Sequence, residues 1–268
     1  FGFDITILPV NQNGVVDPDS LRDAIRKETI LVSVMWVNNE TGSIQPVKEL
    51  ADICLHHEIP FHSDATQAIG KVPINLSEVP VSFLSMSGHK VYAPKGVGIL
   101  FRRKTDPQMH LEIQQHGGSH EYGLRSGTLN VPSIVGLQKA IHMVSEGLHG
   151  ENERIFGLKQ LFTDTLSSNG CLFSENLSSA SCVPHCLSIS LAPLQANTLL
   201  SRMREIAVST GSACSSGTHG ASHVLKALGL TAEQIKGSLR ISFGRPTTSE
   251  EVIFAANTIA DYYKQLLV

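Results

Sequence analysis

Short apolar runs alternate with stretches of helical periodicity in the first part of the chain, and this order constrains the fold more than any other feature. Ile30–Val37 is a continuous β-branched and apolar run, which predicts a strand buried on both faces of a parallel sheet. Similar runs at residues 59–62 and 81–85 predict two further strands, and Pro46 opens a helix that reaches about His57. Strands that alternate with helices predict an α/β fold with a mostly parallel sheet.

Polar residues follow each of these three strands. They are Asn39 after the first, Asp64 and Gln67 after the second, and Lys90 after the third. Ligands of open α/β sheets bind at the carboxyl ends of the strands, so we expect these residues to share one site. Each of them alone is more typical of a loop or a helix cap, and their recurrence at one sheet edge is what favours a site.

The stretch Ser85–Lys90 has the residue types of a Schiff-base site. A lysine at the end of a strand can attack a carbonyl with its amine, and the small polar residues beside it can hold an anionic group. A glycine-rich turn at residues 93–98 follows directly. The alternative for Lys90 is a solvated surface charge, because a short motif is a hypothesis until its context agrees.

Residues 114–130 contain four glycines, two histidines and Arg125, and they have neither a helical nor a strand period. Such a stretch inside a compact domain is typical of a functional loop, and a surface linker is the alternative. The sequence becomes helical after it, which predicts a domain boundary near residue 130. We therefore expect residues 1–130 to form part of a large domain and residues 131–268 to form a small α+β domain.

Cys214 lies in a run of small polar residues, rich in glycine and serine, at residues 210–220. Because this run offers little apolar cover, we expect an exposed thiol on a flexible loop. A loop thiol that can swing suits sulfur transfer, since it must reach a substrate and later an acceptor. An incidental cysteine in a surface turn is the alternative.

Five more strands are predicted, at residues 3–10, 98–102, 187–191, 206–209 and 239–243. In the last of these, alternation places Arg240 and Ser242 on one face.

The charge balance and the hydropathy argue against two classes of partner. The chain carries 21 basic and 24 acidic side chains, a net charge of −3, so no basic field favours nucleic acid. No apolar run is long enough for a membrane span. The start, Phe1–Asp4, has neither an initiator methionine nor a basic n-region. We therefore do not expect a signal peptide here, and the start is typical of the middle of a protein.

The five cysteines show no regular framework, which indicates a reducing compartment. We therefore expect a cytoplasmic protein, with an organelle as the alternative. Cys182 and Cys186 flank His185, but this spacing lacks the usual two-residue gap and a second cysteine pair, which disfavours a metal site.

Five motifs, spread in order over nearly the whole chain, resemble those of the cysteine desulfurases, which are pyridoxal 5'-phosphate (PLP) enzymes of the class-V aminotransferase type. The motifs are Val34–Gly42 (VMWVNNETG), His62–Gln67 (HSDATQ), Ser85–Lys90 (SMSGHK), Arg125–Thr128 (RSGT) and Ser212–Gly217 (SACSSG). Each motif alone is weak, whereas together they are specific. The resemblance implies the fold of the PLP-dependent transferases, in which a large domain with a mostly parallel sheet precedes a smaller α+β domain.

The resemblance also implies a set of cofactor contacts. Lys90 would form a Schiff base with the PLP aldehyde, and Asp64 would pair with the pyridinium nitrogen and keep it protonated. Further residues would hold the ring oxygen or the phosphate: Gln67 and Asn39 the phenolic oxygen, Ser87 and His89 the phosphate, and Thr128 the phosphate of the neighbouring subunit's cofactor. The contact from Thr128 implies a homodimer.

Substrate and product follow from the same resemblance. Arg240 would bind the α-carboxylate of L-cysteine with its planar fork. Cys214 would attack the substrate sulfur, which leaves a persulfide on the enzyme and L-alanine as product. The long run of small residues after Cys214 resembles the branch of the family that hands sulfur to a protein such as an iron–sulfur scaffold.

The chain departs from the family pattern at its start. Family members carry an upstream segment with a phosphate-binding loop and a histidine that stacks on the ring, and His89 and His120 match other positions. The sequence is therefore expected to be part of a longer polypeptide or to be completed by another chain. A truncated, non-catalytic dimerising chain is one alternative reading, and a selenocysteine lyase or another PLP β-lyase is a second.

Overall fold

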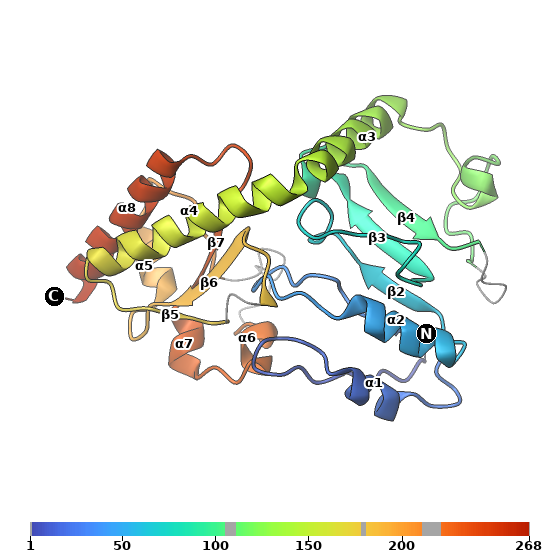
Figure 1. Ribbon diagram of the computed structural model, residues 1–268, viewed down its shortest axis with the longest axis horizontal. Coiled ribbons are helices and arrows are strands. Elements are labelled where there is room, and N and C mark those ends of the chain that lie inside the picture. Colours follow the sequence, from blue (N-terminus) through green and yellow to red (C-terminus); the bar gives the residue numbers. More distant parts are fainter. Residues whose placement is uncertain (1, 105–110, 178–180, 211–220, 268) are drawn as a thin grey trace. The chain divides into compact units, whose positions relative to one another are not determined.

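A computed structural model of the chain describes residues 2–104, 111–177, 181–210 and 221–267 (Figure 1). The chain forms two compact units, each of which combines separate stretches of sequence. We call one the Lys90 unit, which consists of Ile25–Trp36 and Pro46–Gly147. The other, the Arg240 unit, consists of Phe1–Ala24, Val37–Gln45 and Leu148–Val268.

The Lys90 unit is built on a four-stranded sheet in the order β1-β2-β3-β4, of which Figure 1 labels β2, β3 and β4. The strands are β1 (Val32–Ser33), β2 (Phe61–Asp64), β3 (Phe83–Ser87) and β4 (Gly98–Arg102). The first three are parallel, and β4 runs antiparallel to β3. The predicted α/β fold with a mostly parallel sheet is therefore confirmed.

The two faces of this sheet differ because successive side chains of a strand point to opposite sides. Phe61 and Leu84 are buried on one face, where α2 (Val47–His56) lies against β2. The apolar residues of α2 recur at helical spacing, and Leu50 and Cys54 have no exposed surface. The other face carries polar side chains that are partly or fully exposed: Ser33, His62, Asp64, Ser85 and Ser87.

The helix α3 (Val131–Glu146) packs on the 3₁₀ helix η1 (Gly88–Val91) and belongs to the Lys90 unit. Its apolar residues Leu137 and Val144 share a buried cluster with Val91. This packing places the end of the compact unit at Gly147, after α3, whereas the domain boundary predicted near residue 130 precedes α3. The predicted division into two domains remains a prediction.

The Arg240 unit contains a three-stranded antiparallel sheet covered by helices (Figure 1). Its elements are α1 (Pro18–Ala24), α4 (Leu148–Ser168), β5 (Ser174–Glu175), β6 (Cys186–Ser190), α5 (Ala196–Arg202), α6 (His223–Ala227), α7 (Ala232–Lys236), β7 (Ser238–Ser242) and α8 (Ser249–Leu267). The helices α4 and α8 pack together, and Phe162 and Ile259 on them form one core with Ile189 and Leu239 of the sheet. This arrangement is the predicted α+β architecture.

Three strand predictions are wrong in part or in whole. Residues 3–10 form no strand, and only Val10 makes a β-bridge, to Val16. Residues 206–209 also form no strand, and of these only Ser209 makes a bridge. The run 30–37 contains only the two-residue strand β1 and is not buried on both faces. Burial on both faces requires a covering layer on each side, and the described residues cover only one.

Candidate active site

Lys90 follows directly from the end of β3. The 3₁₀ turn of η1 begins after Ser87, and it buries Gly88 and Val91 while the side chain of Lys90 remains exposed. Glycine suits position 88, because a Cβ atom there would lie only 3.0 Å from the carbonyl oxygen of Val97. His89 is also exposed, and its Nδ1 lies 2.7 Å from Ser87 Oγ. The turn therefore fixes the backbone beneath Lys90 and leaves the amine accessible.

Asp64 and Gln67 lie at the end of β2, the parallel neighbour of β3. Asp64 is exposed, and its Oδ1 accepts a hydrogen bond of 2.8 Å from the backbone N–H of Thr66. Gln67 Oε1 accepts a 2.7 Å hydrogen bond from Lys71 Nζ. Because β2 and β3 run in the same direction, Asp64, Gln67 and Lys90 all follow the same edge of the sheet.

A histidine outside the predicted site residues, His62, connects three strands on the polar face of this sheet. His62 Nδ1 lies 2.8 Å from Ser33 Oγ, and His62 Nε2 lies 3.0 Å from Ser85 Oγ. Partial burial lowers the pKa of His62, and the nearby charge of Asp64 opposes that shift. A signal was present in the sequence, since His62 precedes Asp64 by two residues and must share its face of the strand.

Arg240 and Asn39 belong to the Arg240 unit and are bonded to each other. Arg240 Nη1 donates a 3.0 Å hydrogen bond to the backbone carbonyl of Asn39. The Nε–H of Arg240 is buried and has no hydrogen-bond partner among the described residues. An unsatisfied buried donor is unfavourable, and more so on a charged group, so this guanidinium is suited to an anionic ligand.

Asn39 lies on a buried loop, residues 38–43, which we call the asparagine loop. Asn38 Oδ1 accepts hydrogen bonds from the backbone N–H groups of Glu40 at 2.8 Å and of Thr41 at 3.0 Å. A β-bridge between Val37 and Ile44 closes the loop. Within the asparagine loop, Asn39 is the residue that is not buried.

The remaining predicted site residues lie elsewhere. Thr128 is exposed and lies in the Lys90 unit, within the stretch 114–130, which contains the short 3₁₀ helix η2 (Glu121–Gly123). Cys214, the predicted nucleophile, lies outside the described residues.

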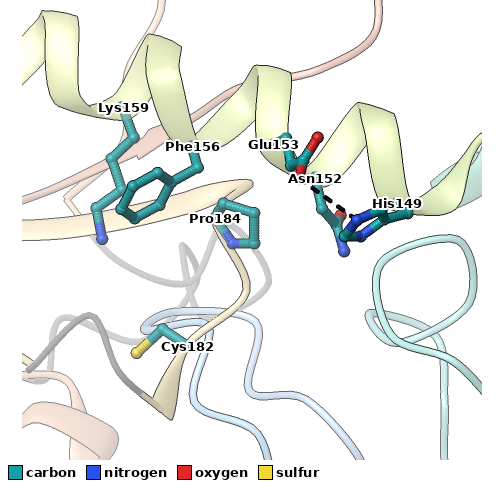
Figure 2. Close-up of a pocket in the computed structure, with 7 residues that line it drawn as sticks. All are labelled: His149, Asn152, Glu153, Phe156, Lys159, Cys182 and Pro184. Atoms are coloured by element: carbon teal, nitrogen blue, oxygen red, sulfur yellow. Dashed lines mark ion pairs between the residues drawn. The ribbon is translucent and has the colours of Figure 1, made fainter.

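A cavity of about 300 Å³ in the Arg240 unit is a separate feature (Figure 2). Its lining residues are His149, Asn152, Glu153, Phe156, Lys159, Cys182 and Pro184. The buried amine of Lys159 lies 3.4 Å from a carboxylate oxygen of Glu175, and burial raises the pKa of the Cys182 thiol. A thiol with a raised pKa is a poor nucleophile. None of the described predicted site residues lines this cavity, so it is not a candidate for the reaction.

Comparisons with known sequences identify the family of the chain. Residues 1–253 match the family model described as Aminotransferase class-V. The cysteine desulfurase IscS of Neisseria gonorrhoeae is 43% identical over 264 residues, which cover 96% of this chain and 63% of that protein. The cysteine desulfurase IscS of Methylococcus capsulatus is 43% identical over 266 residues, which cover 99% of this chain and 65% of that protein. The chain thus spans 63–65% of the length of these two relatives.

Solved structures show the same fold. A NifS-like protein superposes with a TM-score of 0.88 at 34% identity, covering 98% of this chain and 69% of that one. The DndA protein of Streptomyces lividans superposes with a TM-score of 0.76 at 35% identity, covering 90% of this chain and 68% of that one. Among the described residues, no helix combines the length and the apolar character needed to cross a membrane.

Proposed function

The chain belongs to the class-V aminotransferase family, and from this premise we propose that the protein is a PLP-dependent cysteine desulfurase. It converts L-cysteine to L-alanine and retains the sulfur as a persulfide on Cys214. The observation that carries the proposal is the exposed amine of Lys90 at the same sheet edge as Asp64. The identity to proteins named cysteine desulfurase, at 43% over most of the chain, supports the choice of reaction.

The donor set fits the cofactor that enzymes of this family use, which is PLP. When bound, PLP supplies an electron sink for the bonds broken at the substrate. Lys90 offers an amine to its aldehyde, and Asp64 offers a carboxylate to its ring nitrogen, already oriented by the N–H of Thr66. Four other residues complete the set: Ser87 and His89 for the phosphate, and Gln67 and Asn39 for the phenolic oxygen.

Arg240 binds the α-carboxylate of L-cysteine in this proposal. The support is its buried Nε–H, which has no protein partner in the described part of the chain and which a carboxylate would satisfy together with an Nη–H. The Cys214 thiolate attacks the substrate sulfur, so an S–S bond forms and the C–S bond breaks. The electron pair of that bond passes to the substrate carbon, which takes up a proton. One thiol and one L-cysteine thus give one persulfide and one L-alanine.

The wider setting of the enzyme is part of the same proposal. Thr128 reaches the cofactor phosphate of a second subunit, so the enzyme is a homodimer. The persulfide passes to an acceptor protein such as an iron–sulfur scaffold, and the protein is cytoplasmic. The division into a PLP-binding part at residues 1–130 and a small domain at residues 131–268 belongs to this proposal as well.

The decisive experiment is Cys214→Ser in the protein expressed from its complete reading frame. We expect the variant to bind PLP, seen as visible absorption, and to form no persulfide by mass spectrometry after addition of L-cysteine. Cys182→Ser is the matched control and should form the persulfide, because burial raises the pKa of that thiol. Persulfide on the Cys214→Ser protein would overturn the choice of nucleophile. A Cys214→Ala protein that still turns over cysteine would favour the β-lyase instead.

A further inference from the structure

One contact ties Ser222, which lies just after residues 211–220, to the asparagine loop. Ser222 Oγ donates a 2.6 Å hydrogen bond to Glu40 Oε2, across 182 residues of sequence. The side chain of Glu40 is deeply buried, since the residue is only 3% exposed. A carboxylate removed from water is costly unless it is hydrogen-bonded, and a bond to an ionised acceptor is about twice as strong as a neutral one. The contact is therefore well suited to fix Ser222 in place.

Ser222 also begins the helix α6. Its Oγ accepts a 3.2 Å hydrogen bond from the backbone N–H of Leu225, as an N-cap residue does. The same hydroxyl thus joins the first turn of α6 to Glu40. The direction in which the chain enters α6 is set by Glu40 as well as by the helix.

The chain is fixed in a similar way just before residues 211–220. Ser209 and Arg240 exchange two backbone hydrogen bonds, of 3.2 Å from Ser209 N–H and 2.6 Å from Arg240 N–H. Arg240 in turn donates to the carbonyl of Asn39. Both ends of the stretch that carries Cys214, at Ser209 and Ser222, are therefore tied to Arg240 and its neighbours in the asparagine loop.

Glu40 is held firmly enough to serve as an anchor. Its N–H donates to Asn38 Oδ1 at 2.8 Å, and its carbonyl accepts a 3.4 Å hydrogen bond from Cys186 Sγ. The asparagine loop packs closely against β6, the strand that begins at Cys186, because a Cβ atom on Gly42 would lie 3.1 Å from Cys186 Cβ. A shift of Glu40 would break several of these contacts at once.

We infer that Glu40 is a positioning residue for sulfur transfer, which acts through Ser222 to fix the downstream end of the Cys214 stretch beside the substrate-binding Arg240. The inference rests on the proposed function of Cys214 and Arg240. A tether held at both ends raises the effective concentration of its thiol near the bound substrate, and release of one end lowers it. Glu40 takes no part in the bonds that form or break.

The test compares single-turnover persulfide formation in variants of the protein expressed from its complete reading frame. Ser222→Ala should slow formation of the Cys214 persulfide by about 10-fold, since a modest misplacement costs that much or more. The spectral change on mixing with L-cysteine, which reports substrate binding, should remain as in the wild type. Ser222→Thr keeps the hydroxyl and should restore most of the rate.

A matched control separates positioning from simple loss of a helix cap. Thr231 caps α7 as Ser222 caps α6, by accepting from the N–H of Gln234, and it is exposed. Thr231→Ala should leave the persulfide rate unchanged. Hydrogen–deuterium exchange should increase in residues 221–228 of Ser222→Ala and not in α7. An equal loss of rate in both alanine variants would overturn the inference.

A second variant keeps the test decisive if Ser222→Ala folds poorly. Glu40→Gln retains the shape and an oxygen acceptor but removes the charge, so it should slow persulfide formation less than Ser222→Ala and leave the L-cysteine spectrum unchanged. If Ser222→Ala folds and forms the persulfide at the wild-type rate, the role of Glu40 is overturned. If only Glu40→Gln folds, a wild-type rate in that variant has the same meaning. Either result leaves the proposed function intact. A wild-type protein that forms no persulfide would instead overturn the proposed function.

Discussion

The two units hold their proposed site residues in opposite ways. In the Lys90 unit, Asp64 and Lys90 are exposed at the ends of strands, and only the backbone beneath them is buried. In the Arg240 unit, the asparagine loop is itself buried, and only Asn39 emerges from it. The first arrangement separates chemistry from stability, because an exposed side chain can be removed at little structural cost. The second combines them, since the loop that presents the site is also part of the packed interior.

The largest effect is expected for Lys90, whose removal should abolish the reaction while leaving the stability of the Lys90 unit almost unchanged. Lys90→Ala should abolish the visible absorption of bound PLP and all persulfide formation, because no other amine occupies that turn position. Between the PLP-free proteins, where bound cofactor adds no stability to the wild type, the free energy of unfolding should change by only about 0.5 kcal/mol, as for other exposed positions. Absorption spectra and urea denaturation measure the two quantities. Lys95→Ala, which removes an exposed lysine from the following turn, should keep the absorption. If Lys90→Ala lowered the free energy of unfolding by several kcal/mol, the exposed strand ends would also contribute to stability, and the contrast between the two units would fail.

The second prediction tests the asparagine loop. Gly42 has a φ of +80°, and an added Cβ would lie 3.1 Å from Cys186 Cβ and 3.3 Å from Val183 Cγ2. Gly42→Ala should lower the free energy of unfolding by about 3 kcal/mol, from backbone strain and overpacking together. Gly96→Ala in the Lys90 unit is the control, with a φ of +89° and nothing within 4 Å of the added Cβ.

Gly96→Ala should lower the free energy of unfolding by only about 1 kcal/mol, from backbone strain alone. Urea denaturation of both variants measures the difference. Equal losses would mean that the asparagine loop can yield around a new methyl group, and the claim that it is part of the packed interior would fail.

Some local features of the fold were predictable from the sequence, whereas the strands predicted at residues 3–10 and 206–209 are absent. The strand at 98–102 has the predicted bounds, and the helix at 47–56 follows from its apolar spacing. The burial of Ile30–Val37 was not predictable, because an apolar run shows only that a strand can be covered. Whether each face is covered depends on other parts of the fold, and Leu31 and Met35 are 49% and 41% exposed.

The same limit applies to the site. The position of Asp64, Gln67 and Lys90 at one sheet edge could be predicted, because each lies at or after the end of a recognisable strand. Period-2 alternation likewise predicted the face of the strand on which Arg240 lies. The contact between Glu40 and Ser222 could not, because 182 residues separate them and neither residue belongs to a local pattern that names its partner. Such contacts depend on how distant loops meet, which a single sequence does not encode in any short motif.

The smallest expected effect concerns the polar face of the Lys90 sheet, where His62 couples protonation to stability. Burial lowers the pKa of His62 below its ordinary value of 6.5. The unfolded chain therefore binds a proton more readily than the folded protein does as the pH falls below 6.5. The stabilising contribution of neutral His62 is fully present above pH 6.5 and is lost as the pH falls from there through the lower pKa of the folded state.

His62→Gln should make the free energy of unfolding less dependent on pH between 6.5 and 5 than it is in the wild type. Urea denaturation at several pH values measures this slope, and the values at pH 8 give the separate cost of the lost hydrogen bonds to Ser33 and Ser85. If the slopes of variant and wild type coincide, His62 does not couple protonation to folding. In that case no side chain on the polar face would couple its chemistry to stability. A reduced slope would mean that His62 does so, and that only the exposed strand ends with Asp64 and Lys90 are independent of stability.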